Sequence, residues 1–349
     1  RRRGRRLSDD HRGGSRGVTR PWPAGAATGV GSFPGADSVD AHRTVFGELP
    51  EFPHLVELPG RGPGASLIGR SAALLVDMPV EIAPSSWRIT SRAGRDLHRA
   101  RDLLAVDLDA LEQAADGWAG PLKVQAAGPW TLAAGVELPN GHRVLTDAGA
   151  VRDLTASLAE GLREHLAEVR RRVPGASVVL QLDEPSLPAV LAGALPTASG
   201  YGTVRSVDAN VAEQGLRNVL GVIDAGARAV HCCATDVPIT LLRAAGADAI
   251  AIDAALVSTD ALDDLGTAID AGVSLWLGVV PGTDASIDHN TGRDAVRRIW
   301  HTLGFADAEA AASIVPTPAC GLANATPDYA RRAMKVVREV GEALRESGG

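Results

Sequence analysis

A histidine and two cysteines stand side by side at the end of an apolar run, in RAVHCCATD at residues 228–236, and the chain has only one further cysteine. If this run is a β-strand, residues two apart project to the same side, so His231 and Cys233 point together while Cys232 points the other way. Imidazole nitrogen and thiolate sulfur are both common metal ligands. Cys232 is instead assigned to the core, where free cysteine behaves as a small hydrophobe.

Two further side chains complete a candidate ligand set. Cys320 lies in the loop PTPACGLANATP, where a core cysteine would have little to pack against, and Asp253 follows the apolar run AIAI. With His231 and Cys233 they provide nitrogen, sulfur, oxygen and sulfur donors, a set that suits tetrahedral zinc better than a redox metal. The four ligands come from three separate stretches, so the fold itself has to build the site. The alternative is that Cys233, like Cys232, is simply buried in the core.

Composition places the chain among globular proteins. Its 349 residues, 45% of them hydrophobic and 22% charged, can bury the core of one large domain or two ordinary ones. No run of 18 apolar residues appears and no secretory leader is indicated, so we expect no membrane span and a cytoplasmic location. Three cysteines argue against a disulfide framework. A formal net charge of −7 gives no reason to bind nucleic acid or an anionic membrane.

The start of the chain differs from the rest. Residues 1–20 contain eight arginines and almost no large apolar side chain, so they cannot bury enough surface to offset the entropy of ordering. No aromatic residue stands among them to stack on bases, which argues against a nucleic-acid-binding arm. We therefore expect a disordered tail over residues 1–22 and a single folded domain over residues 23–349.

Short apolar runs alternate with helical patterns through the folded part. The predicted strands cover residues 26–33, 54–58, 122–128, 177–183, 228–233, 249–254, 274–280 and 313–318. Apolar residues at intervals of three and four predict helices over 150–173, 208–224, 237–244, 258–271, 292–304 and 327–346. The last of these has Thr326 as N-cap and Pro327 at its first position. Two more helices, near 65–76 and 92–115, form an insertion around residues 59–121.

Strands that alternate with helices favour parallel pairing through right-handed crossovers. Eight such units close into a (β/α)8 TIM barrel, where catalytic side chains stand at the C-terminal ends of the strands. An open doubly wound sheet is the alternative, but GVGSFPGAD lacks the third glycine of its phosphate-binding fingerprint. Conspicuous side chains do stand at the predicted strand ends: Ser32, Glu57, Trp130, Asp183, Glu184, His231, Cys233, Asp253 and Cys320.

Five motifs, in order over about nine-tenths of the chain, give the sequence a family resemblance. GVGSFPG, GPWTL, QLDEP, HCC and PACGL resemble the catalytic barrel of cobalamin-independent methionine synthase. The resemblance implies a zinc ion held by His231, Cys233 and Cys320, with Asp253 at the place of the carboxylate ligand. It also implies that the metal binds the thiol of homocysteine, which takes a methyl group from 5-methyltetrahydrofolate to form methionine.

The same resemblance assigns substrate contacts. Asp183 would receive the ammonium group of the amino acid with Glu184 beside it, and the Ser32 loop would help to hold the substrate. Trp130 stands where the folate ring is expected to stack. For QLDEP the alternative is a helix-capping Asp–Glu pair before proline. Zinc would make the nucleophile, because a metal-bound thiol is deprotonated, whereas a free thiol with a pKa of about 8.5 is mostly protonated at neutral pH.

The sequence departs from the family pattern in three places. Asp253 replaces the glutamate expected as the third ligand, which shortens the arm by one methylene. The stretch GVVPGTDAS lacks the histidine that the family uses after the seventh strand, so Asp284 or His289 would have to replace it, and Asp284 is taken as the catalytic candidate. VELPGRGPG does not reproduce the family's acidic substrate motif, which leaves Glu57 as the candidate there and Arg61 unexplained.

The methyl donor and two other functions stay open. We expect the protein to lack the family's separate N-terminal barrel, which helps to bind polyglutamylated folate, so the donor is either a folate or a methylated corrinoid protein. One alternative function is alkyl transfer to another thiol such as coenzyme M. The other is a catalytically altered barrel that binds zinc and an amino acid, which the changed third ligand and the missing histidine would favour.

Overall fold

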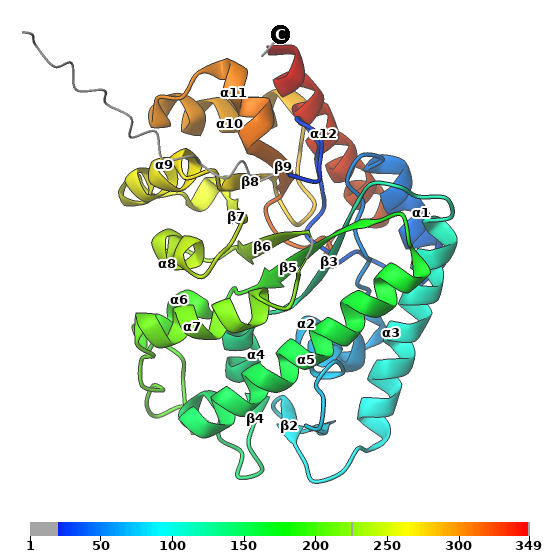
Figure 1. The fold of residues 1–349 in the computed structure, drawn as a ribbon, viewed down its shortest axis with the longest axis vertical. Coiled ribbons are helices and arrows are strands. Elements are labelled where there is room, and N and C mark those ends of the chain that lie inside the picture. Colours follow the sequence, from blue (N-terminus) through cyan, green and yellow to red (C-terminus); the bar gives the residue numbers. More distant parts are fainter. Residues whose placement is uncertain (1–19, 198, 225, 348–349) are drawn as a thin grey trace, which may run out of the picture.

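The computed structural model describes residues 20–197, 199–224 and 226–347. Six parallel strands form one curled sheet at its centre, in the order β3-β5-β6-β7-β8-β9, and helices surround this sheet (Figure 1). All six were predicted from the sequence, to within one residue at most ends. Their bounds are β3 (Pro121–Ala127), β5 (Ser177–Asp183), β6 (Ala227–Cys232), β7 (Ala249–Asp253), β8 (Ser274–Val280) and β9 (Ile314–Pro318).

Two irregular segments, residues 26–33 and 54–58, link the two edges of this sheet. The prediction that both are regular strands is wrong, because only isolated parallel bridges form, Ser32 with Glu57 and His54 with Lys123. Backbone N–H groups nonetheless donate at 2.8–3.3 Å at all three junctions, from β9 through the two segments to β3: Thr28 to Pro316, Glu57 to Gly31, Phe33 to Glu57, Leu55 to Lys123 and Lys123 to Pro53. The chain therefore has the predicted α/β class and a TIM-barrel-like architecture.

Glycine explains why the first segment is not a regular strand. A Cβ atom on Gly29 would lie 2.2 Å from Nε2 of the buried His54, and one on Gly31 would lie 2.8 Å from the side-chain amide of Gln125. The absent side chains make room for two buried polar groups inside the barrel. A glycine-rich strand is weak because it has little side chain to pack, so the ladder is interrupted here.

The predicted helices around the barrel are confirmed. They are α5 (Ala148–Arg172), α7 (Ala209–Leu220), α8 (Ile239–Ala244), α9 (Leu262–Asp270), α10 (His289–Leu303) and α12 (Pro327–Ser347). The periodicity does not predict α1 (Ser38–Glu48) or the short helices α4 (Pro129–Gly135), α6 (Leu187–Ala192) and α11 (Asp307–Ser313). Of the described helices, none is long and apolar enough to cross a membrane.

Local signals set the ends of the longest helix, α5. The side chain of Asp147 accepts hydrogen bonds from the N–H groups of Gly149 and Ala150, which satisfies two of the donors that a helix start leaves free. The apolar stripe from Val151 to Val169 faces the core. The helix stops at Arg172, just before Pro174, because proline cannot continue the hydrogen-bond ladder.

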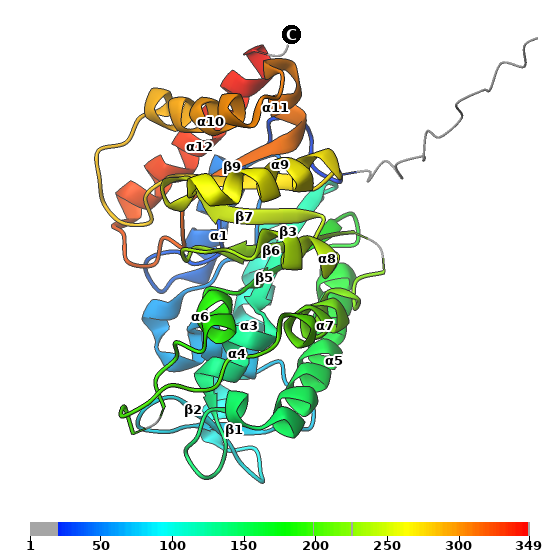
Figure 2. The ribbon, with the colours of Figure 1, turned by 90° about the vertical axis from the view of Figure 1, so that its left-hand side faces the viewer.

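The insertion after the second barrel segment contains both predicted helices, α2 (Leu67–Ala72) and α3 (Arg95–Ala114). It also contains an antiparallel hairpin that the sequence did not predict, made of β1 (Val80–Ile82) and β2 (Trp87–Ile89), and β4 (Val136–Glu137) adds to β2 in parallel. Figure 2 shows this small sheet at one end of the molecule, beyond α4. The side chain of Arg88 binds Glu137 across it at 2.6 Å.

Aromatic side chains plug the N-terminal end of the barrel. Trp22 is 6% exposed, stacks on Phe52 with ring centroids 5.3 Å apart, and meets the edge of Trp276 at 5.3 Å. Alanine and valine side chains of the strands pack around these rings. The tail predicted over residues 1–22 lies outside the described residues apart from its last three, and of those Trp22 belongs to this plug.

We expect Phe52→Ala to lower the free energy of unfolding by about 3–5 kcal/mol, because a fully buried ring is lost from the middle of the plug. Val106→Ala is the matched control, since Val106 is 52% exposed on α3 and its loss should change stability by no more than about 0.5 kcal/mol. Chemical denaturation followed by circular dichroism measures both. Equal, small effects of the two substitutions would contradict the packing described.

Candidate active site

Polar side chains line the inside of the barrel towards the C-terminal ends of its strands. Lys123 and Gln125 alternate on β3, Gln181 and Asp183 alternate on β5, and His231 stands opposite Asp183 on β6. All five are buried. Hydrogen bonds connect them to each other and to the irregular first segment, so the polar groups of this layer are held by the barrel wall.

The hydrogen bond between Asp183 and His231 is the centre of this layer. Oδ1 of Asp183 lies 2.9 Å from Nδ1 of His231 and also accepts the Gln181 amide at 2.8 Å. Burial alone would lower the pKa of His231, but the hydrogen bond and charge of Asp183 outweigh it and raise that pKa. Nε2 of the same ring is buried and has no hydrogen-bond partner among the described residues. A carboxylate that fixes Nδ1 in this way leaves Nε2 free to bind a metal.

Two of the three cysteines meet at the mouth of the barrel. Sγ of Cys233 lies 3.3 Å from Sγ of Cys320, and the two thiols form no disulfide. The hydrogen bond from Cys233 and the nearby His231 lower the pKa of Cys320 to about 6, whereas the pKa of Cys233 is raised by the same contact. Cys232 is fully buried on the other face, and burial raises its pKa to about 11, so its predicted place in the core is confirmed.

The predicted zinc ligands are brought together only in part. Within the described ranges, no group of three or more His, Cys, Asp or Glu side chains is arranged to hold a metal ion. His231, Cys233 and Cys320 supply donors of the right chemistry, since a buried imidazole nitrogen without a partner stands near two thiols. Asp253 ends β7 but turns to its own loop, where it accepts the N–H of Ala255 at 2.8 Å.

Glu57 lies inside the barrel beside Asp183 and is 5% exposed. Burial raises its pKa to about 7 despite the guanidinium of Arg70, whose Nε lies 3.7 Å from Oε1 of Glu57. Arg70 is held in turn by Asp107 on α3 at 2.6 Å, and Arg61 binds the same carboxylate at 2.7 Å. Arg61, which the sequence left unexplained, therefore belongs to a buried ion network through which the insertion supports Glu57.

Ser32 lies next to the loop that carries Cys320. Its carbonyl accepts the N–H of Leu322 at 2.9 Å. A Cβ atom on Gly321 would lie 2.0 Å from Oγ of Ser32, so only glycine lets the two loops approach this closely. The Ser32 loop is therefore packed directly against the loop that carries Cys320.

Glu184, predicted to bind substrate, is a helix cap. Its fully buried carboxylate accepts hydrogen bonds from the N–H groups of Trp130 and Thr131 and from the Thr131 hydroxyl, at 2.7–3.0 Å. These donors belong to the first turn of α4, which favours a carboxylate. Gly128 makes the contact feasible, because a Cβ atom there would lie 2.3 Å from Oε1 of Glu184. The capping alternative for QLDEP is thus correct for the glutamate, and Asp183 alone faces the site.

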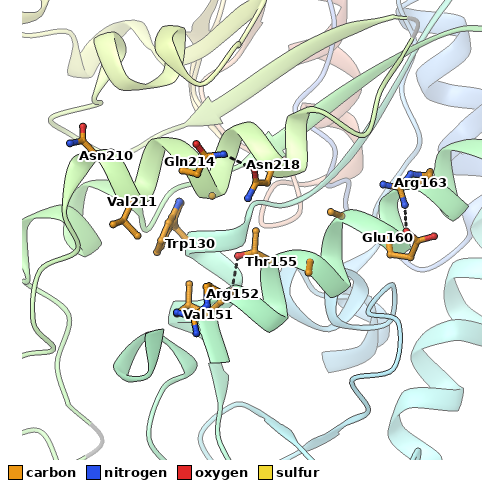
Figure 3. Close-up of a pocket in the computed structure, with 13 residues that line it drawn as sticks. Trp130, Val151, Arg152, Thr155, Glu160, Arg163, Asn210, Val211, Gln214 and Asn218 are labelled. Carbon is orange, nitrogen blue, oxygen red and sulfur yellow. Dashed lines mark hydrogen bonds and ion pairs between the residues drawn. The ribbon is translucent and has the colours of Figure 1, made fainter. Parts of the chain in front are cut away.

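Trp130 does not offer a stacking surface for a folate ring. It is 1% exposed, and its indole N–H donates to the carbonyl of Ala212 on α7 at 2.9 Å. Figure 3 shows its side chain between α5 and α7, at the edge of a cavity of about 750 Å³ on the outside of the barrel. The side chain at the third position of GPWTL points away from the strand ends because it packs under Gly215 of α7.

The two candidates for the missing histidine are both engaged elsewhere. The carboxylate of Asp284 accepts the N–H and the hydroxyl of Thr326 at 2.8 and 2.6 Å and so ties the loop after β8 to the start of α12. His289 faces Glu339 of α12, with Nδ1 3.9 Å from Oε2. Asp284 therefore has a structural role in this conformation, and its predicted catalytic role is not supported.

The buried polar partners of the site were not predicted from the sequence. Lys123 has no exposed surface and donates to the carbonyl of Val30 at 2.7 Å, and burial lowers its pKa to about 7. The signal was present in LKVQAAG, where Lys123 and Gln125 alternate with apolar residues in a strand that is buried on both faces. A polar residue at every second position of such a strand indicates a polar barrel interior.

We expect Glu184→Ala to lower the free energy of unfolding by about 2 kcal/mol or more, because it leaves two buried N–H groups of α4 without an acceptor. Glu184→Gln keeps one acceptor oxygen at the same place, so it should lose markedly less stability. Thermal and denaturant unfolding of the two variants compare these effects. A Glu184→Ala protein as stable as the wild type would contradict the capping role.

Known proteins share the family pattern and the fold of this chain. The chain matches the family described as "Cobalamin-independent synthase, Catalytic domain" over residues 25–343. A B12-independent methionine synthase from Shewanella sp. W3-18-1, solved in complex with selenomethionine, is similar in structure with a TM-score of 0.62 and 14% identity, covering 93% of this chain and 98% of that one.

A second solved structure, a GH5_18 protein from Streptomyces cattleya, has a TM-score of 0.45 and 16% identity and covers 92% of this chain and 80% of that one. No curated protein sequence matches the chain. The family match spans nearly the whole described structure and includes the buried Asp183–His231 pair and both mouth cysteines. This chain belongs to the cobalamin-independent synthase catalytic-domain family.

Proposed function

We propose that this protein is a zinc-dependent methyltransferase that methylates the thiol of homocysteine to form methionine. One observation carries the proposal. A buried imidazole, fixed by Asp183 through Nδ1 and unpartnered at Nε2, stands near two thiols whose sulfur atoms are 3.3 Å apart. A barrel interior has no structural need for such a group, because an unpaired buried nitrogen costs stability.

His231, Cys233 and Cys320 would hold the ion, and Asp253 is the proposed carboxylate ligand once its side chain leaves the local cap. Bound zinc would supply a thiolate at neutral pH by lowering the pKa of a coordinated substrate thiol. The protein's own side chains orient the atoms that would bind the metal. Asp183 sets the tautomer of His231, and the buried layer below keeps that carboxylate in place through Gln181.

Asp183 also has an atom left for the substrate. Its Oδ1 accepts both known hydrogen bonds, and Oδ2 has no partner among the described residues. Asp183 lies close enough to Glu57 for its negative charge to add to the effect of burial and raise the pKa of Glu57. Two carboxyl groups therefore face this part of the barrel. We propose that the ammonium group of homocysteine binds between them, which favours an amino-acid thiol over coenzyme M.

The solved relative supports a small amino-acid ligand, since the Shewanella protein is a B12-independent methionine synthase that was crystallised with selenomethionine. The methyl donor in the proposal is 5-methyltetrahydrofolate or a methyl-corrinoid protein. A second function, a barrel that binds zinc and an amino acid without catalysis, is favoured by one observation. Asp253 caps its own loop, and Asp284 binds Thr326, so two of the expected catalytic groups are occupied.

We expect the purified protein to hold close to one zinc per chain, and Cys320→Ser to lose most of it, because a hydroxyl is a poor zinc ligand beside a thiolate. Cys232→Ala is the matched control and should keep the metal, since Cys232 points into the core. Asp253→Ala should weaken zinc binding less than Cys320→Ser. Elemental analysis and chelator competition measure these contents. Unchanged zinc in Cys320→Ser would remove the proposed centre.

We expect Asp183→Asn to weaken homocysteine binding at least tenfold, because a charge-assisted hydrogen bond of about 1.5–3 kcal/mol is lost. Calorimetry with 4-mercaptobutyrate, which is homocysteine without its amino group, is the control. If Asp183 binds the ammonium group, affinity for this analogue should fall much less. An equal loss for both thiols would show that Asp183 acts only by orienting His231.

The two functions are separated by a direct assay. Zinc-loaded protein given homocysteine and 5-methyltetrahydrofolate, or a methylated corrinoid protein, should form methionine if the first function holds. Tight binding of homocysteine without methionine from either donor would support the non-catalytic barrel instead.

A further inference from the structure

The cavity beside Trp130 lies outside the barrel, between α5 and α7, and the proposed function does not use it. Its volume of about 750 Å³ is within the usual range for small-molecule sites, about 300–1,000 Å³. The two helices run side by side along it, and both begin at the same end (Figure 3). Arg152 and Asn210 stand near that end, while Asn218 and Arg163 stand further along.

Small side chains keep this space open. Ala156 and Ala159 of α5 line it three positions apart on one helix face, with Thr155 beside them. Gly215 of α7 also lines it, and a Cβ atom there would lie 2.8 Å from the ring of Trp130. Neighbouring helices usually fill the space between them with interdigitating side chains. Here two alanines and a glycine leave an apolar hollow between the helices.

Most polar groups along the cavity already bind each other. Glu160 and Arg163 form an ion pair on α5, and the side-chain amide of Gln214 donates to Asn218 on α7 at 2.7 Å. Because these side chains are paired, they offer an incoming ligand no uncompensated charge.

Arg152 and Asn210, near the starts of the two helices, differ from these pairs. Arg152 is exposed and forms no ion pair or hydrogen bond, and the Asn210 amide forms no hydrogen bond, with any residue that the structure describes. The carboxylate of Asp147, at the same start of α5, is occupied by the N–H groups of Gly149 and Ala150. A free guanidinium and a free amide therefore stand near one end of the cavity. Both can donate hydrogen bonds to an oxyanion such as a carboxylate or phosphate.

The extent of the cavity favours a small molecule over a protein. A stable protein interface takes about 20–30 residues a side around an apolar centre, whereas 13 residues line this cavity. Of the large apolar side chains that are exposed in the described ranges, Val211 alone belongs to the lining. The apolar surface that it offers is therefore too small for the centre of such an interface.

We propose that this cavity is a ligand site, separate from the reacting centre, for a small molecule with an apolar body and one oxyanion. The apolar body would lie against Gly215 and the small side chains of α5, and the oxyanion would accept hydrogen bonds from Arg152 and Asn210. The site does not depend on the proposed zinc chemistry, because none of its lining residues belongs to the layer around Asp183 and His231.

The test uses the full-length protein and two fluorescent probes with the same rings. The probe 8-anilinonaphthalene-1-sulfonate carries an oxyanion, and N-phenyl-1-naphthylamine lacks it. We expect the wild-type protein to bind both, and Arg152→Gln to weaken binding of the sulfonate at least tenfold while the neutral amine stays within twofold. Arg171→Gln, on the same helix and outside the lining, is the matched control and should change neither titration.

Ala156→Trp fills the cavity without changing its charge, and we expect it to abolish binding of both probes. Zinc and homocysteine at saturation should displace neither probe, because the cavity lies outside the barrel. Circular dichroism checks that each variant is folded, and sedimentation velocity gives its oligomeric state.

Unchanged sulfonate affinity in either Arg152→Gln or Ala156→Trp would overturn the assignment, and so would an equal loss of both probes in Arg152→Gln. Displacement of the probes by homocysteine, or a wild-type protein that binds neither probe, would overturn it too. A wild-type dimer that Ala156→Trp converts to monomers would show that a second copy of the chain occupies the cavity instead. Loss of zinc or homocysteine binding in the wild type would count against the proposed function alone.

Discussion

The buried hydrogen bond between Asp183 and His231 is the contact on which the site depends. Adjacent strands β5 and β6 bring the two residues into register, so the bond is set by the sheet itself. It determines which nitrogen of the ring carries the proton and leaves Nε2 unpaired near the two thiols. A free nitrogen at this depth is unfavourable unless a ligand binds it, and this links the fold to the proposed metal chemistry.

The rest of the molecule supports this contact from several sides. Below it, Gln181 and Lys123 fill the barrel with polar groups, and the aromatic plug closes the other end. Beside it, the insertion holds Arg70 against Glu57 through Asp107. Glu184, next in sequence to Asp183, anchors α4 and keeps the end of β5 fixed. Residues outside the reacting centre thus act mainly by holding Asp183, Glu57 and His231 in place.

Strand positions were predictable because parallel barrel strands are continuous apolar runs. The alternation of side-chain direction along a strand correctly separated Cys233 from Cys232. Side-chain direction beyond a strand end was not predictable. Trp130, in the first turn of α4, packs outward against α7, and Glu184 caps α4. Asp253 accepts a hydrogen bond from its own loop, and only the local backbone decides this. Residues 26–33 do not form the predicted regular strand, because Gly29 and Gly31 leave room there for His54 and Gln125.

X-ray absorption spectroscopy of the zinc-loaded protein measures the proposed ligand shell directly. We expect a first shell with two sulfur atoms at about 2.3 Å and one imidazole nitrogen at about 2.0 Å, and a third sulfur when homocysteine is added. A shell made only of oxygen and nitrogen, or one that homocysteine leaves unchanged, would contradict it.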